Sequence, residues 1–246
     1  MSDHREPCPA PRSGADRPAV DETRTETAAE PTAGERWIAS SDGAVLEAEL
    51  RVAPDGRAAV VLCHPHPHYG GSMRAPLVGE LFRVLPARGI TALRFNFRGV
   101  ERSTGTWDEG RGEREDAAAA LDALVALVPA STRVVLVGWS FGADMALSLR
   151  DPRIAGWCAI APPLHFPGGD RASGAFAALA DDPRPKHLVV GERDDLVPTE
   201  KTTAATRTWR STTVLSVPGA DHFFAGHASE VTEAVSGFVL RVASQS

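Results

Sequence analysis

Cysteine is scarce in this sequence, and its few copies lie far apart. The chain of 246 residues contains three cysteines, Cys8, Cys63 and Cys158. Their odd number, their wide spacing and the lack of a CxxC motif argue against a disulfide framework and against a structural zinc site. These cysteines fit a reducing compartment, so we expect a cytoplasmic protein.

Long apolar stretches and basic clusters are also missing. The first residues, MSDHREPCPAPRSG, lack the apolar core that a secretory signal needs, and no apolar run approaches the length that spans a bilayer. The net charge is −6, with only two lysines, Lys186 and Lys201, and no basic stripe. We therefore expect neither a membrane nor a nucleic acid as a partner, and the sequence carries no sign of the oligomeric state.

Large aliphatic side chains are nearly absent from the first 35 residues. Val20 is the only one between Ser2 and Gly34, a stretch in which Pro, Ala, Glu, Asp, Arg and Thr dominate. Such a segment buries too little apolar surface to offset the entropy that is lost on ordering. We predict a disordered N-terminal tail over residues 1–35 and a single domain over residues 36–246. A docking arm for a partner is the alternative for the tail.

From Trp37 onward, short apolar runs alternate with amphipathic segments. Residues 44–53 alternate between apolar and polar, as a half-buried strand does, and we place this strand antiparallel at an edge. Further strands, mostly apolar as buried parallel strands are, are predicted at 58–64, 91–97, 133–138, 154–161, 187–191 and 213–217. Helices are predicted at 76–89, 115–129, from 141, 173–180, 198–209 and 228–243. This alternation predicts an α/β fold whose mostly parallel sheet has helices on both faces.

A serine stands between two glycines at one junction of strand and helix, in RVVLVGWSFGADMAL (residues 133–147). The turn after such a strand is tight, and small neighbours let the flanking backbone pass closely. Gly138 and Gly142 supply that room, and the helix N-terminus adds unpaired N–H groups beside Ser140. We interpret Ser140 as a nucleophile presented on an elbow; a structural turn serine is the alternative.

A serine nucleophile needs a base and a carboxylate that orients the base. In this type of fold the chain order is serine, then an acid, then histidine. The loop after strand 187–191 contains Asp194, and the loop after strand 213–217 contains His222. Asp195 is an alternative to Asp194, and His227 fits better as a residue at a helix start. We therefore predict a triad of Ser140, Asp194 and His222.

The oxyanion formed in such a reaction needs a second N–H donor from the loop after an early strand. That loop reads CHPHPHYGGSM (residues 63–73). Its prolines have no N–H, which leaves His66, His68 or Tyr69 as the donor, and His66 has the most suitable position. The alternating histidines could instead bind zinc or copper, but no aspartate follows at the spacing of a metallo-hydrolase motif. We expect no metal.

Five motifs in order resemble the α/β-hydrolase superfamily: LCHPHPHYGGSM, TALRFNFRGVERSTG, GWSFG, GERDDLVP and GADHFF. Within it, the chain resembles a small bacterial group of predicted hydrolases related to dienelactone hydrolase and serine aminopeptidase-like proteins. The resemblance implies the triad above and an oxyanion hole formed by the backbone N–H groups of Phe141 and His66. Glu101 replaces a glycine that is common in such proteins, and we expect it to place a charge at the rim of the site.

These observations predict a serine hydrolase that cleaves a carboxylic ester of a small-molecule acyl substrate without a cofactor. A thioesterase or a peptidase would use the same triad, and a non-catalytic binding module is an alternative of another class. Residues 163–186 are too few and too polar to add a lid to a crossover helix, so we expect an open site. Aromatic residues beside the motifs are expected to line it, with ordinary core packing as the alternative for each: Trp139, Tyr69, Phe223 and Phe224.

Overall fold

A computed structural model describes residues 34–54, 56–165 and 171–245. The expected tail over residues 1–35 lies outside these residues, except for its last two. Gly34 and Glu35 begin the first strand, β1 (Gly34–Ala39). The ordered sheet therefore begins slightly before the predicted domain boundary.

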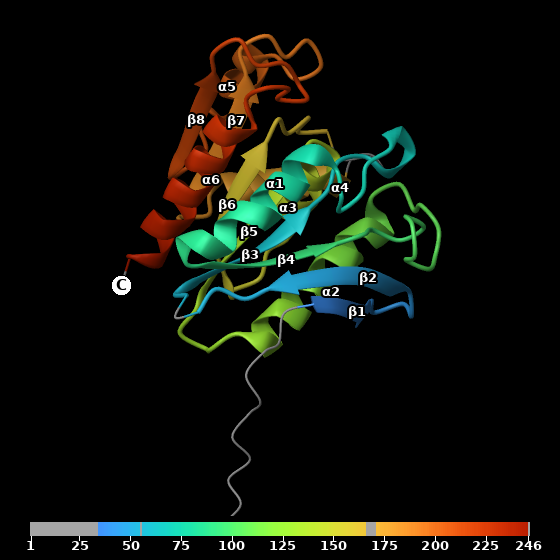
Figure 1. Cartoon of the computed structure of the whole chain (residues 1–246). Helices are drawn as coiled ribbons and strands as arrows, with labels where there is room; N and C mark the ends of the chain where they lie inside the picture. Colours follow the sequence, from blue (N-terminus) through green and yellow to red (C-terminus); the bar gives the residue numbers. More distant parts are fainter. Residues whose placement is uncertain (1–33, 55, 166–170, 246) are drawn as a thin grey trace, which may run out of the picture. The chain divides into compact units, whose positions relative to one another are not determined.

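The strands form one eight-stranded sheet in the order β1-β2-β4-β3-β5-β6-β7-β8 (Figure 1). The pairs from β4 to β8 are all parallel. The bounds of the remaining strands are β2 (Val45–Arg51), β3 (Ala58–Cys63), β4 (Ile90–Phe95), β5 (Arg133–Trp139), β6 (Ile154–Ile160), β7 (Lys186–Gly191) and β8 (Thr212–Val217). The predicted, mostly parallel sheet is confirmed.

The antiparallel end of the sheet differs from the prediction in one respect. β2 is antiparallel to β4, as expected, but β1 pairs with its other side. The edge strand is therefore β1 and not the strand predicted at residues 44–53. The sequence GERWIA of β1 was missed because only one of its large apolar side chains, Ile38, is buried, whereas Trp37 is 53% exposed.

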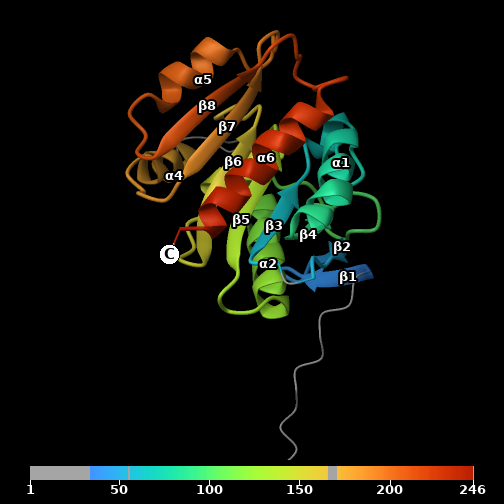
Figure 2. The same ribbon diagram turned by 60° about the vertical axis from the view of Figure 1, so that its left-hand side comes forward.

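Helices cover both faces of the sheet, as predicted (Figures 1 and 2). Their bounds are α1 (Pro76–Val84), α2 (Arg111–Leu127), α3 (Phe141–Ser148), α4 (Arg171–Ala180), α5 (Thr199–Thr206) and α6 (Ala228–Ala243), with short 3-10 turns η1 (Pro67–Tyr69) and η2 (Leu85–Arg88). Apolar residues of α2 and α3 belong to one core cluster and those of α1 and α6 to another. The sheet therefore lies between two apolar layers.

Strand β3 shows why the parallel strands read as continuous apolar runs. Successive side chains of a strand point to opposite faces. Ala59 and Val61 accordingly pack in the cluster with α2 and α3, whereas Val60 and Leu62 pack in the cluster with α1 and α6. Each residue of such a strand needs an apolar side chain, because both faces of the strand are covered.

The segment between β6 and β7 contains α4 as its only helix among the described residues. The crossover thus uses most of the chain available there, and its described part has no inserted lid, as predicted.

Within the described ranges, none of the helices has the length and apolar character that crossing a membrane would require.

Candidate active site

Ser140 lies at the turn between β5 and α3, at the carboxyl end of the central strands. Its backbone has φ 54° and ψ −122°, a conformation that residues other than glycine rarely adopt. Such strain is found at functional sites more often than elsewhere. The side chain remains half-buried, with its hydroxyl directed toward the loop after β8.

Both glycines beside Ser140 are required by close backbone contacts. A Cβ atom on Gly138 would lie 2.2 Å from the carbonyl oxygen of Gly142, and one on Gly142 would lie 2.4 Å from the carbonyl oxygen of Cys63. Real Cβ atoms do not approach other atoms so closely. The prediction that small residues make this turn possible is therefore confirmed.

Two consecutive hydrogen bonds connect Ser140 to His222 and His222 to Asp194. The Ser140 hydroxyl lies 3.0 Å from His222 Nε2, and His222 Nδ1 lies 2.8 Å from Asp194 Oδ2. A carboxylate only accepts hydrogen bonds, so Nδ1 carries the proton and Nε2 is left to accept the one from Ser140. The imidazole is thereby held in the tautomer that a general base requires.

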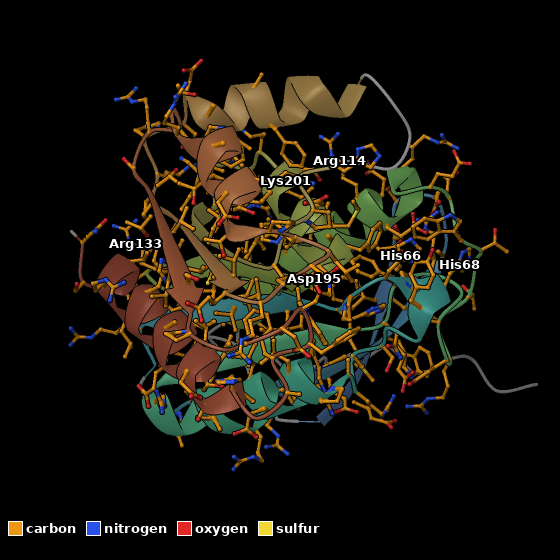
Figure 3. All side chains as sticks on the ribbon, turned by 90° about the horizontal axis from the view of Figure 1, so that it is seen from above. His66, His68, Arg114, Arg133, Asp195 and Lys201 are labelled. Carbon is orange, nitrogen blue, oxygen red and sulfur yellow. The ribbon has the colours of Figure 1, made fainter. Side chains whose placement is uncertain are left out.

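Asp194 is fixed in place by the turn that follows it. Its side chain is buried, and its Oδ1 accepts the backbone N–H groups of Leu196 (2.9 Å) and Val197 (2.7 Å). The neighbouring Asp195 is exposed, near the middle of the view in Figure 3. The structure therefore brings Asp194, and not the alternative Asp195, to His222.

Two contacts hold the loop that contains His222 against its surroundings. Trp139 Nε1 donates to the carbonyl oxygen of His222 (3.2 Å). At the end of β7, a Cβ atom on Gly191 would lie 2.5 Å from the carbonyl oxygen of Ala220, so the loops after β7 and β8 are in close contact. His227 is the N-cap of α6, in agreement with its expected place at a helix start.

The four aromatic residues predicted to line the site divide into two pairs. Trp139 and Phe224 are buried in an apolar cluster, which is the alternative stated for them. Tyr69 is 87% exposed and Phe223 63% exposed. The Phe223 ring meets the ring of His222 edge-on, with centroids 5.6 Å apart, so Phe223 lies at the rim of the site.

The two candidate oxyanion donors lie next to each other. Phe141 is the first residue of α3, where a helix N–H has no intrahelical partner, and its ring centroid is 5.1 Å from that of His66. In the loop after β3, the N–H of Tyr69 donates to the His66 carbonyl (3.1 Å) and the N–H of His68 donates to His66 Nδ1 (3.2 Å). Among the three predicted alternatives, only the N–H of His66 makes no hydrogen bond within the described residues.

The histidines of the HPHPH run lie in different environments. His64 is buried, and burial lowers its pKa to about 4. Its neutral ring donates from Nδ1 to the Pro65 carbonyl (2.6 Å) and accepts the Phe97 N–H at Nε2 (3.1 Å), so neither ring nitrogen faces the other histidines. Over the part of the chain that the structure describes, no three His, Cys, Asp or Glu side chains are grouped to hold a metal ion.

Trp107, which lies between β4 and α2, was not among the site residues predicted from the sequence. Its ring centroid is 4.6 Å from that of His66 and 5.1 Å from that of Phe141, so it packs against both candidate donors. His66 and His68 lie to one side of Asp195 in Figure 3. The only sequence signal for Trp107 was a lone aromatic residue after a strand that ends at the same edge of the sheet.

Glu101 adopts a backbone φ of 49°, which explains why glycine suits this position. Its side chain forms an ion pair with Arg74, and its Oε2 also accepts Asn96 Nδ2 (3.0 Å). The predicted charge near the site is thus present, but it is shared with a neighbouring guanidinium.

Comparison with known proteins gives consistent similarities. An α/β-hydrolase domain model matches residues 56–239. An uncharacterised protein from Rickettsia prowazekii is 34% identical over 200 residues, which cover 78% of this chain and 82% of that protein. The solved structure of an α/β serine hydrolase homologue from Coxiella burnetii is 31% identical, with a TM-score of 0.73, over 83% of this chain and 96% of that one. A serine hydrolase without lid from Xanthomonas campestris is 27% identical, with a TM-score of 0.73, over 85% and 94%.

Proposed function

Because this chain belongs to the α/β-hydrolase family, we propose that it is a serine hydrolase that cleaves carboxylic esters through an acyl-enzyme. The observation that carries this proposal is the continuous path of hydrogen bonds from Asp194 through His222 to Ser140. A nucleophile, a base and an orienting carboxylate are the parts that acyl transfer requires. The same three groups also serve thioester and amide hydrolysis, so the leaving group is the part of the proposal that a substrate panel must test.

In the proposed reaction, Ser140 Oγ attacks the acyl carbon and His222 Nε2 takes the hydroxyl proton. The tetrahedral intermediate collapses when the bond to the alcohol oxygen breaks, and His222 gives its proton to that oxygen. Water then attacks the acyl-enzyme with His222 again as base, which releases the acid and restores the serine. Asp194 stays ionised throughout and stabilises the imidazolium.

The negative oxygen of each intermediate needs donors that are already in place. The N–H of Phe141 begins α3, where the helix dipole is positive, and the free N–H of His66 approaches from the loop after β3. Two such donors are the usual number in this type of site, and the loss of one costs roughly 100- to 1,000-fold in kcat. Trp107 supports this geometry because its ring packs on both donor residues.

The surroundings of the triad favour a short acyl group. Exposed apolar side chains from three loops are present at the catalytic edge, namely Tyr69, Leu196 and Phe223. They form a rim but not a roof, since the described residues between β6 and β7 contain only α4. A site that encloses little of the acyl chain gains little from additional methylene groups, because each gives about 0.8 kcal/mol only where it is buried.

Covalent labelling tests the proposal. The wild-type protein should react with a fluorophosphonate probe and hydrolyse p-nitrophenyl acetate, and Ser140→Ala should lose both. Ser148→Ala is a matched control at the other end of α3, because the Ser148 hydroxyl donates to the Met145 carbonyl and, among the described residues, makes no hydrogen bond to the triad. Labelling that survives in Ser140→Ala would show that another residue is the nucleophile, and no labelling of the wild type would refute the proposed activity.

A further inference from the structure

A cavity opens among the loops at the carboxyl edge of the sheet. It has a volume of about 720 Å³ and opens between residues 67–72 and residues 98–107, the loops that follow β3 and β4. Sites for small ligands commonly enclose roughly 300–1,000 Å³, so the cavity is large enough for part of a substrate. We call it the loop cleft.

Trp107 connects the loop cleft with the catalytic edge. It lines the cleft, and its ring also packs on His66 and Phe141. Phe141 follows Ser140 directly in the chain. The loop cleft and the two candidate oxyanion donors therefore contact the same side chain, that of Trp107.

Glu101 gives the loop cleft a carboxylate with one free oxygen. The side chain is 36% exposed and lines the cleft. Its Oε2 accepts hydrogen bonds from both Arg74 and Asn96. No described residue donates a hydrogen bond to Oε1, so this oxygen is open to a ligand.

Ion pairs connect Glu101 with a network of charged side chains. Within the described residues, the network contains four carboxylates and three guanidinium groups, which are Glu35, Glu47, Glu49, Glu101, Arg74, Arg94 and Arg102. Burial would raise the pKa of Glu47, but hydrogen bonds from Arg74, Arg102 and Asn96 outweigh it and lower the pKa to about 2. Glu47 is therefore ionised at neutral pH, and its charge pairs with the guanidinium groups of Arg74 and Arg102.

Arg98 also lines the loop cleft, but its charge is already neutralised. Its side chain is 6% exposed, and its guanidinium contacts both Asp116 and Asp42 at 2.7 Å. One positive group thus faces two carboxylates. The cleft therefore combines a carboxylate oxygen without a partner, surplus negative charge and the indole ring of Trp107, and an indole face attracts cations.

We propose that the loop cleft binds a cationic ammonium group on the alcohol part of the substrate, so that the preferred substrates are esters of amino alcohols. This inference rests on the proposed ester hydrolysis. The ammonium group lies between the free oxygen of Glu101 and the ring of Trp107. His68 also lines the cleft, and its ring packs on the same indole with the centroids 5.0 Å apart.

Two esters of nearly equal size and shape test the inference. Acetylcholine and 3,3-dimethylbutyl acetate differ mainly in the charge of the alcohol. For the wild type, kcat/KM should favour acetylcholine by roughly five- to thirtyfold, the range of a partly desolvated cation–π and carboxylate contact. In Glu101→Gln the ratio of the two kcat/KM values should fall to about 1–2, since the free oxygen then carries no charge.

Glu49→Gln is the matched control. Glu49 belongs to the same network and contacts Arg74 at 3.1 Å, but it does not line the loop cleft. This variant should keep the wild-type ratio. If the ratio of the two kcat/KM values falls equally in Glu49→Gln and Glu101→Gln, overall charge and not the cleft sets the preference. A wild-type ratio near 1 would overturn the inference.

A binding measurement separates this inference from the proposed reaction. Saturation-transfer NMR with choline on the Ser140→Ala protein should show contact with the methyl groups, and the contact should be lost in the double variant with Glu101→Gln. If the wild type neither hydrolyses p-nitrophenyl acetate nor reacts with fluorophosphonate, but choline still binds in a Glu101-dependent way, the catalytic proposal fails and the cleft assignment holds. If p-nitrophenyl acetate is hydrolysed and choline does not bind, the cleft assignment fails alone.

Discussion

Asp144 should make the stability of this protein depend on pH in a way that can be measured by one substitution. It lies in α3, one turn after Ser140, and its side chain is 1% exposed. Its two oxygens accept the backbone N–H groups of Leu164 (3.0 Å) and His165 (2.9 Å). No ion pair joins it to a cation among the described residues, so its charge is stabilised by these two dipoles alone.

Burial raises the pKa of Asp144 to about 7 from the ordinary aspartate value of 3.8, although the two N–H groups oppose the change. The folded protein therefore binds this proton more tightly than the unfolded chain does. The resulting stability is fully present below pH 3.8 and is lost as the pH rises through 7. Asp144 alone should contribute about 2–3 kcal/mol more to the free energy of unfolding at pH 5 than at pH 8.

Urea denaturation of the wild type and of Asp144→Asn at pH 5, 6, 7 and 8 measures this contribution. Asparagine does not titrate, so the stability of the wild type minus that of the variant should fall by about 2–3 kcal/mol from pH 5 to pH 8. The amide places an N–H₂ opposite a backbone donor, which adds a destabilisation that does not change with pH.

The exposed Asp195 provides the baseline, because Asp195→Asn removes a carboxylate that makes no buried contact. The stability difference between the wild type and this variant should be nearly constant over the same pH range. A constant difference for Asp144→Asn as well would refute the reasoning, because it would mean that burial does not control the titration of Asp144.

Three further outcomes follow from the geometry. Asp194→Asn should lower kcat for p-nitrophenyl acetate by roughly 10³- to 10⁴-fold, because the histidine tautomer is no longer fixed, whereas Asp195→Asn should stay within about twofold; the reverse order would move the orienting role to Asp195. Gly142→Ala should lower the free energy of unfolding in urea by about 3 kcal/mol or more, because its Cβ would lie 2.4 Å from the Cys63 carbonyl oxygen; unchanged stability would mean that the turn can open. For p-nitrophenyl esters from acetate upward, kcat/KM should stop rising at short chains, since an open site buries few methylene groups; a steady increase to long chains would show a deep acyl pocket.

The sequence was most informative where structure depends on neighbouring residues. Alternation of apolar runs identified the parallel strands and the helices on both faces, because the covered faces of a strand or helix impose their period directly on the sequence. The elbow at Ser140 was also predictable, since its positive φ and the close contact between Gly138 and Gly142 arise within a few residues of chain. The contact of Gly142 with the Cys63 carbonyl involves a distant segment. Strand β1 was missed because its single buried apolar side chain leaves no such period.

Other features depend on residues that are far apart in the chain, and only the tertiary structure decided them. The two aspartates after β7 have the same chemistry, but Asp194 alone is turned inward by the N–H groups of Leu196 and Val197. His66 was favoured by its position in the loop, and the structure adds that the turn uses the N–H groups of the other two candidate donors, His68 and Tyr69. Trp107 and Glu101 become parts of a cleft because the loops after the neighbouring strands β3 and β4 both line it. The sequence specifies which side chains and backbone groups are present, but packing between distant segments sets the orientation of each group and its partners.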